Sequence, residues 1–159
     1  MRRIILCGMA MAGLAGASAA AANTCLKPAD DAAFGVAALK SELMVVALSC
    51  EAQDRYNAFV SRYRNELQSN ERSMQAYFVR AYGRNGEEEH DNYITSLANA
   101  QSIDQIHQGP GFCKQATALF DEVLGLPNGV DIAGFAATKT LVQPLELEDC
   151  PPDARTARR

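Results

Sequence analysis

The 159-residue sequence contains no tryptophan and only two histidines, and both shortages narrow what the chain can do. Without tryptophan, an apolar core must be built from Leu, Val, Ala, Phe, Tyr and Met. With only His90 and His107, a histidine-rich metal centre is not expected, because such centres need clustered ligands. Glu87, His90 and Asp91 have the spacing of half a di-metal site in a helical bundle, but a second half is missing. A solvated helix start is the better interpretation, and no metal or other cofactor is expected.

Catalytic and phosphate-binding motifs are missing as well. No G-x-S-x-G nucleophile elbow occurs. The turns GRNG (83–86) and GPG (109–111) lack the glycine spacing and the Lys-Ser/Thr ending of a phosphate loop. Basic residues do not predominate either, since the formal net charge is −4. An acidic chain is a poor candidate for a nucleic-acid partner, because neutralisation of phosphates supplies much of that affinity.

The N-terminal residues, MRRIILCGMAMAGLAGASAAAANTC, have the pattern of a secretory signal peptide. Two arginines precede an apolar stretch with A-x-A sites, which predicts cleavage near Ala22 and a location in the periplasm or outside the cell. The predicted organisation is a signal peptide at 1–22, a single helical domain at 23–150 and a disordered tail at 151–159. After the signal, no run is expected to reach the roughly 20 apolar residues of a membrane span.

Four cysteines remain after the predicted cleavage: Cys25, Cys50, Cys113 and Cys150. An even number in an exported chain predicts two disulfides, and the wide spacing excludes a C-x-x-C redox or zinc motif. Three pairings are open. The preferred one joins Cys50 to Cys113, at two helix ends, and Cys25 to Cys150, near the two ends of the domain.

Hydrophobic periodicity predicts an all-α protein, a compact bundle of about five helices with a short irregular C-terminal segment. The first helix, from Asp31 to Cys50, is apolar around most of its circumference and is therefore expected at the centre. Ser69 and Asn70 are expected to cap or break the helical pattern that follows. The further expected helices lie at 51–68, 74–81, 87–106 and 112–124, with one more possible at 130–138.

The apolar stretch ELMVVALSC (42–50) begins with a carboxylate, Glu42. Burial would raise its pKa, so one interpretation is the general acid of a small hydrolase that acts on envelope polymers. The preferred interpretation is an ion pair with Arg62 or Arg55, because structural ion pairs are the usual explanation of such a residue.

Arginines and tyrosines are concentrated between residues 54 and 86. Binding surfaces favour this combination. The candidate binding face consists of Arg55, Tyr56, Arg62, Tyr63, Arg64, Arg80 and Tyr82. The competing interpretation is structural, with the tyrosines in the core and the arginines paired with nearby acids.

The segments ELMVVALSC, RYNAFV, YFVRAYG and FCKQATALFDEVL resemble a family of small, uncharacterised exported bacterial proteins with a helical fold and paired cysteines. The resemblance covers residues 39 to 124, and Cys50 and Cys113 are its most specific marks. It implies export and a helical fold, and it assigns no activity.

These features predict an exported, non-enzymatic helical protein that binds a protein or an anionic component of the cell envelope. Two alternatives stay open. One is the hydrolase with Glu42 as its acid. The other is an acid-stress periplasmic chaperone that exposes apolar helices when its carboxylates are neutralised. The oligomeric state is not predicted.

Overall fold

The computed structural model describes residues 25–144 and residue 150, and this part of the chain is mainly helical. The helices are α2 (Pro28–Ser49), α3 (Gln53–Arg62), α4 (Arg64–Tyr82), α5 (Gly86–Gln108), α6 (Phe112–Ala116), α7 (Ala118–Leu124) and α8 (Ile132–Ala137), with 3-10 turns η1 (Gly83–Asn85) and η2 (Gly109–Gly111). The predicted helical bundle is confirmed. The predicted signal peptide, its cleavage near Ala22 and the tail at 151–159 lie outside the described residues.

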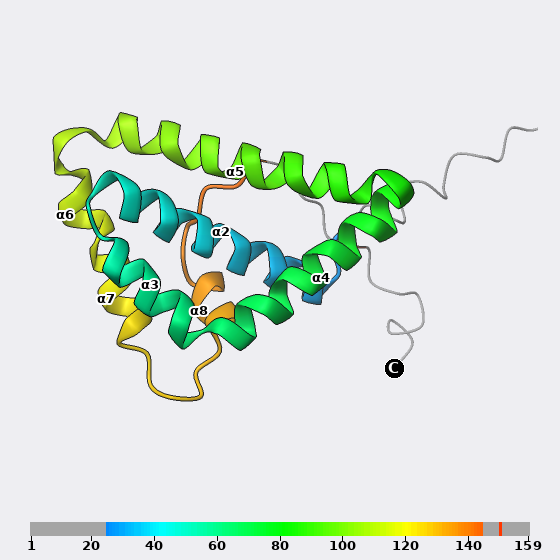
Figure 1. Cartoon of the computed structure of the whole chain (residues 1–159), viewed down its shortest axis with the longest axis horizontal. Helices are drawn as coiled ribbons and strands as arrows, with labels where there is room; N and C mark the ends of the chain where they lie inside the picture. Colours follow the sequence, from blue (N-terminus) through cyan, green and yellow to red (C-terminus); the bar gives the residue numbers. More distant parts are fainter. Residues whose placement is uncertain (1–24, 145–149, 151–159) are drawn as a thin grey trace, which may run out of the picture.

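The central position expected of the first helix is confirmed by α2. It contacts α3, α4, α5 and α8. Figure 1 shows α2 inside a frame made by α5 on one side, α4 on the second and α3 with α7 on the third. Its side chains Phe34, Leu39 and Leu43 are at most 1% exposed, as expected of a helix that is apolar around most of its circumference.

By length and composition α2 also meets the requirements of a membrane-spanning helix. The expectation that no later run is long and apolar enough was therefore wrong. A core helix and a membrane span share these properties, because each removes most of its surface from water. Here other helices of the same chain cover those faces.

Two apolar clusters form along α2. Around its C-terminal half, Phe59 of α3 and Phe120 of α7 are fully buried. Around its N-terminal half, the Phe34 ring makes edge-to-face contacts with Tyr77 and Tyr93, each with ring centroids 4.9 Å apart. Such aromatic contacts stabilise the fold beyond their buried area, so the absence of tryptophan leaves no shortage of ring packing.

The preferred cysteine pairing is confirmed. Cys50, the residue after α2, is bonded to Cys113 of α6, with Cα atoms 5.4 Å apart. Cys25, just before α2, is bonded to Cys150 with a Cα separation of 4.8 Å. Both ends of the central helix are thus cross-linked to later parts of the chain. Two disulfides fit an oxidising compartment.

The break expected at Ser69 and Asn70 is wrong. The chain instead bends at Tyr63, between α3 and α4, and α4 continues through both residues. Tyr63 is 4% exposed and its hydroxyl donates a hydrogen bond of 2.7 Å to the carbonyl of Val123. The Asn70 amide donates to the Ala33 carbonyl at 2.9 Å, so this residue joins α4 to α2 instead of capping a helix.

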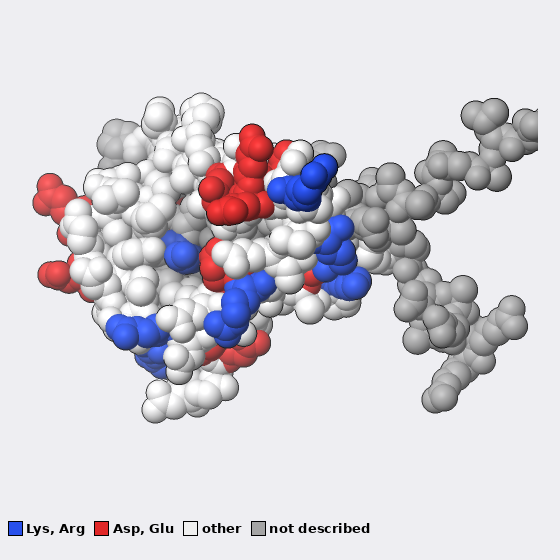
Figure 2. Space-filling view, turned by 45° about the vertical axis from the view of Figure 1, so that its right-hand side comes forward, with Lys and Arg blue, Asp and Glu red and all other residues white. Residues whose placement is uncertain are grey.

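Basic side chains do not form one continuous patch on the face seen in Figure 2. They occur in several separate groups, and acidic side chains lie between these groups. This face therefore shows no broad single-sign field, and any charge recognition there depends on individual residues.

Candidate functional site

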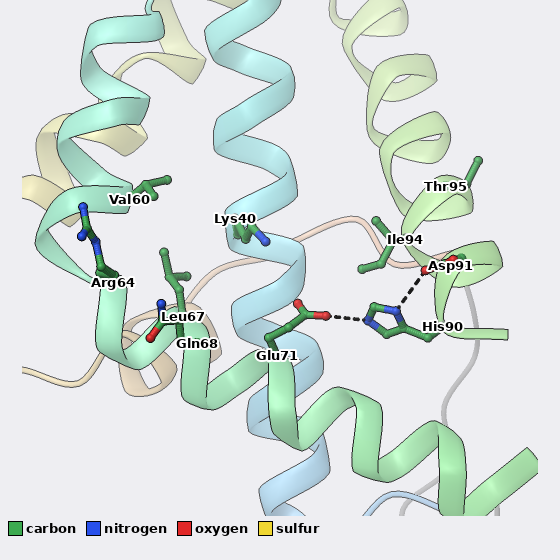
Figure 3. Close-up of a pocket in the computed structure, with 10 residues that line it drawn as sticks. All are labelled: Lys40, Val60, Arg64, Leu67, Gln68, Glu71, His90, Asp91, Ile94 and Thr95. Carbon is green, nitrogen blue, oxygen red and sulfur yellow. Dashed lines mark hydrogen bonds and ion pairs between the residues drawn. The ribbon is translucent and has the colours of Figure 1, made fainter. Parts of the chain in front are cut away.

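An open cleft of about 880 Å³ lies between α4 and α5, with α2 at its base (Figure 3). Its volume is within the range of small-molecule binding sites. The lining residues are Lys40, Val60, Arg64, Leu67, Gln68, Glu71, His90, Asp91, Ile94 and Thr95. We call this space the outer cleft.

A smaller space of about 140 Å³ adjoins the outer cleft. Lys40, Leu67, Glu71 and Ile94 line both spaces. The remaining lining residues of the smaller space are Ala37, Ser41, Met44, Tyr56 and Asn70. We call this space the inner chamber; it is formed by α2, α3, α4 and α5.

The geometry of the α4–α5 hairpin explains why a cleft is present. At Gly86 the helices touch, because a Cβ atom added there would lie 2.8 Å from the backbone nitrogen of Val79. Figure 1 shows that α4 and α5 diverge from this hairpin. The bend at Tyr63 then turns α3 away from the direction of α4, so the wall opposite α5 is built from both α3 and α4.

His90 joins the two walls of the outer cleft. Its side chain comes from α5 and is almost completely buried, with the residue 9% exposed. Nε2 lies 3.1 Å from Glu71 Oε1 on α4, and Nδ1 lies 3.4 Å from Asp91 Oδ1 (Figure 3). The ring also contacts Phe78 edge to face. The expectation of a solvated helix start is therefore wrong for His90, although it holds for Asp91, which is exposed.

The described residues contain no group of three or more side chains suited to a metal ion. Glu87, which has the spacing of a metal ligand relative to His90, is exposed and does not line the outer cleft. Glu71 and Asp91 instead face the His90 ring, so their charges are directed to a neighbouring side chain.

Two cations of the outer cleft, Lys40 and Arg64, are exposed. Neither makes an ion pair with any residue that the structure describes. Figure 3 shows Lys40 on α2 between the two walls and Arg64 at the edge, beside the bend between α3 and α4. Their positive charges are thus available to a bound anion.

The predicted arginine–tyrosine face is divided by the fold. Arg55 donates to the carbonyl of Thr117 at 3.1 Å and forms an ion pair with Asp121. Arg62 donates to the carbonyls of Leu124 and Leu126, at the C-terminal end of α7. A cation at this position satisfies carbonyl groups that the helix leaves without partners.

The other members of the predicted face lie elsewhere. Arg80 is held by Asp30 at 2.6 Å and lies over the ring of Tyr77. Tyr82 is 41% exposed at the far end of α4. Of the seven residues of the predicted face, only Tyr56 lines the inner chamber and only Arg64 lines the outer cleft. The seven residues therefore do not form one surface, because most of them attach helices to one another.

Glu42 is half-buried on α2 and does not line the outer cleft or the inner chamber. Desolvation by burial raises its pKa, and the negative charge of Asp104 on α5 raises it further. The expected ion pair with Arg62 or Arg55 is wrong, because both arginines bind the α7 region. Among the described residues Glu42 makes no ion pair.

None of the predictions from the sequence had indicated that Lys40 and Glu71 line the outer cleft, that Ser41 lines the inner chamber or that His90 is buried. One signal was present for Lys40, which is the sole basic residue of α2. A single cation in a nearly apolar helix requires either a partner or an opening to solvent. The long-range pairing of Glu71 with His90 had no local signal.

Comparison with protein-family models, curated proteins and solved structures found no match to this chain. The resemblance to small exported proteins with paired cysteines therefore stays a prediction.

Proposed function

We propose that this chain is an exported binding protein whose outer cleft holds a ligand with an acid group. The observation that carries the proposal is the pair of cations without ion-pair partners among the described residues, Lys40 and Arg64, in a cleft of about 880 Å³. Apolar side chains of Val60, Leu67 and Ile94 lie on the same walls. The ligand is therefore amphipathic, with an acid for the cations and an apolar body for the walls.

The chemistry of the two cations suits this role. Hydrogen bonds between an ammonium or guanidinium group and a carboxylate are stronger than those between neutral groups. Arg64 offers a planar fork of donors, whereas Lys40 is a point charge on a flexible stem. The Glu71 carboxylate does not occupy the two cations, because it is directed at His90.

The proposed location is the periplasm or the cell exterior. The predicted signal peptide and the two disulfides support it, since disulfides persist in oxidising compartments. Binding is better supported than the hydrolase alternative, because Glu42 does not line the outer cleft.

The test is calorimetric titration of the oxidised protein with hexanoate and benzoate, each compared with its neutral amide. We expect both acids to bind more tightly than their amides. Lys40→Gln and Arg64→Gln should each weaken acid binding by about tenfold, the usual effect of losing one charged hydrogen bond. Lys114→Gln and Arg72→Gln are matched controls, because both residues are exposed and line neither space.

Two results would overturn the proposal. One is equal affinity for each acid and its amide. The other is acid binding that is unchanged in both Lys40→Gln and Arg64→Gln.

A further inference from the structure

We propose that the inner chamber selects the ligand and that the ligand class is a small aromatic acid with a hydroxyl group on its ring. This inference rests on the proposed function, since the acid group is held by the cations of the outer cleft. The chamber holds the ring. Lys40 lines both spaces and therefore stands where the acid group and the ring meet.

The size of the inner chamber limits which ligand it holds. The inner chamber has a volume of about 140 Å³. An engineered apolar cavity of about 150 Å³ in another protein binds benzene. A six-membered ring therefore fits the chamber, whereas a larger fused ring system does not.

The composition of the chamber walls favours an aromatic ring. Met44, Leu67 and Ile94 supply aliphatic and thioether surface, and Tyr56 supplies an aromatic ring. Thioether and aromatic groups make favourable contacts with ring edges and faces. A flexible alkyl chain would gain less from these walls, because it loses more conformational freedom on binding than a rigid ring does.

The inner chamber is also lined by a residue with a buried hydroxyl group. Ser41 is 7% exposed and lines the inner chamber, and its Oγ atom has no hydrogen-bond partner in the described part of the chain. A serine within a helix commonly donates back to the carbonyl four residues earlier. The Ser41 hydroxyl makes no such bond with a described residue, and its oxygen is closed to solvent, so a turn of the side chain toward the chamber brings it to a polar atom on the ligand. A buried polar group without a partner is costly, so a ring hydroxyl that meets it is favoured.

The test uses calorimetry on the full oxidised chain with 3-hydroxybenzoate, 4-hydroxybenzoate, benzoate and hexanoate. The better hydroxybenzoate isomer should bind about fivefold more tightly than benzoate, as one added neutral hydrogen bond predicts. Ser41→Ala should remove this preference, so that the hydroxybenzoates and benzoate bind the variant with equal affinity. Ser73→Ala is the matched control, because Ser73 is an exposed serine of α4 that does not line the chamber.

A second variant tests the size argument. Met44→Phe adds volume at a half-buried wall position and should weaken all three ring acids while hexanoate binding through Lys40 persists in the outer cleft. Circular dichroism confirms that each variant is folded.

The outcomes separate the two proposals. If no acid binds better than its amide, the proposed function fails. If acids bind in a Lys40-dependent manner but hexanoate equals the hydroxybenzoates, or Ser41→Ala keeps the preference for a ring hydroxyl, only the present inference is overturned. Undiminished binding of the ring acids to Met44→Phe also overturns it.

Discussion

Replacing Cys50 and Cys113 with alanine should lower the free energy of unfolding by about 4 kcal/mol. The bond between them closes a loop with a sequence separation of 63 residues. In the chain-entropy treatment, a loop of this length restricts the unfolded chain by about 14 cal/mol/K, which gives that free energy near 25 °C. Ordinary domains have about 5–15 kcal/mol of stability, so the loss is a large fraction of the total.

The outer disulfide should contribute a similar amount despite its greater span. Cys25 and Cys150 are separated by 125 residues, but the inner bond already removes 63 of them from the path. The loop that the outer bond closes therefore includes only about 62 residues of free chain, which again corresponds to about 4 kcal/mol. The two double-alanine variants should therefore lose nearly the same free energy of unfolding, because the 50–113 loop lies inside the 25–150 loop.

The assay is urea unfolding of the wild-type protein and the two double-alanine variants, followed by far-UV circular dichroism. Tryptophan fluorescence is not an option, because the chain has none. A cost below about 1 kcal/mol for either deletion, or a far greater cost for the outer deletion than for the inner one, would contradict this account of the two loops. The slope of stability against urea should rise in both variants, because an unfolded chain without the bond exposes more surface.

Three further substitutions test packing and electrostatics. Glu42→Gln should stabilise the protein at neutral pH. Burial and Asp104 raise the folded-state pKa of Glu42 above its ordinary value of 4.5. This carboxyl therefore contributes stability below pH 4.5, and that stability is lost as the pH rises through the folded-state pKa. Thermal unfolding from pH 4 to 8 should show a flatter profile for the variant, and parallel profiles would contradict the assignment. Gly86→Ala should destabilise by about 1–2 kcal/mol, because its Cβ would lie 2.8 Å from the Val79 nitrogen. Gly134→Ala, whose Cβ meets nothing within 4 Å on α8, should instead stabilise by up to about 1 kcal/mol, and urea titration compares the two glycine variants.

Features encoded by local pattern were predictable from the sequence. The apolar circumference of residues 31–50 predicted α2 at the centre. The even cysteine count predicted two disulfides, and the places of Cys50 and Cys113 at helix ends and of Cys25 and Cys150 near the domain ends favoured the pairing that the structure has. The first signal depends on burial, which acts on the composition of a whole segment, and the second depends on the pairing of thiols in an oxidising compartment. The glycines of the 83–86 turn likewise marked the α4–α5 hairpin, although that turn is the 3-10 element η1 followed by the first residue of α5.

Features that depend on distant partners were not predictable. Arg55 and Arg62 appeared to be surface cations because their partners in the α7 region lie more than 60 residues away. The bend at Tyr63 has the same origin, since the Tyr63 hydroxyl bonds the carbonyl of Val123. Local propensity favoured a break at Ser69, but propensities of a few tenths of a kcal/mol are smaller than the tertiary contacts that keep α4 continuous.

Three neighbouring residues of α2 have different environments because they lie on different faces of the helix. Lys40, Ser41 and Glu42 are consecutive, and each step along a helix rotates the side chain by about 100°. Lys40 is therefore exposed in the outer cleft, Ser41 is buried in the inner chamber, and Glu42 is half-buried near Asp104. Glu42 was the candidate acid because it is a carboxylate in an apolar run, yet the fold turns this residue away from the outer cleft.

Because Lys40 and Glu42 lie on different faces of α2, we expect one to affect ligand binding and the other to affect stability. Neutralising Glu42 should change the pH dependence of unfolding without changing acid binding, because Glu42 lines neither space. Neutralising Lys40 should do the opposite, because Lys40 is exposed and makes no ion pair with a described residue whose loss could weaken the fold. If either variant changed both acid binding and the pH dependence of unfolding, α2 would have to shift between its neighbours when that charge is lost. The outer cleft would then change shape with α2 and would not be a fixed site.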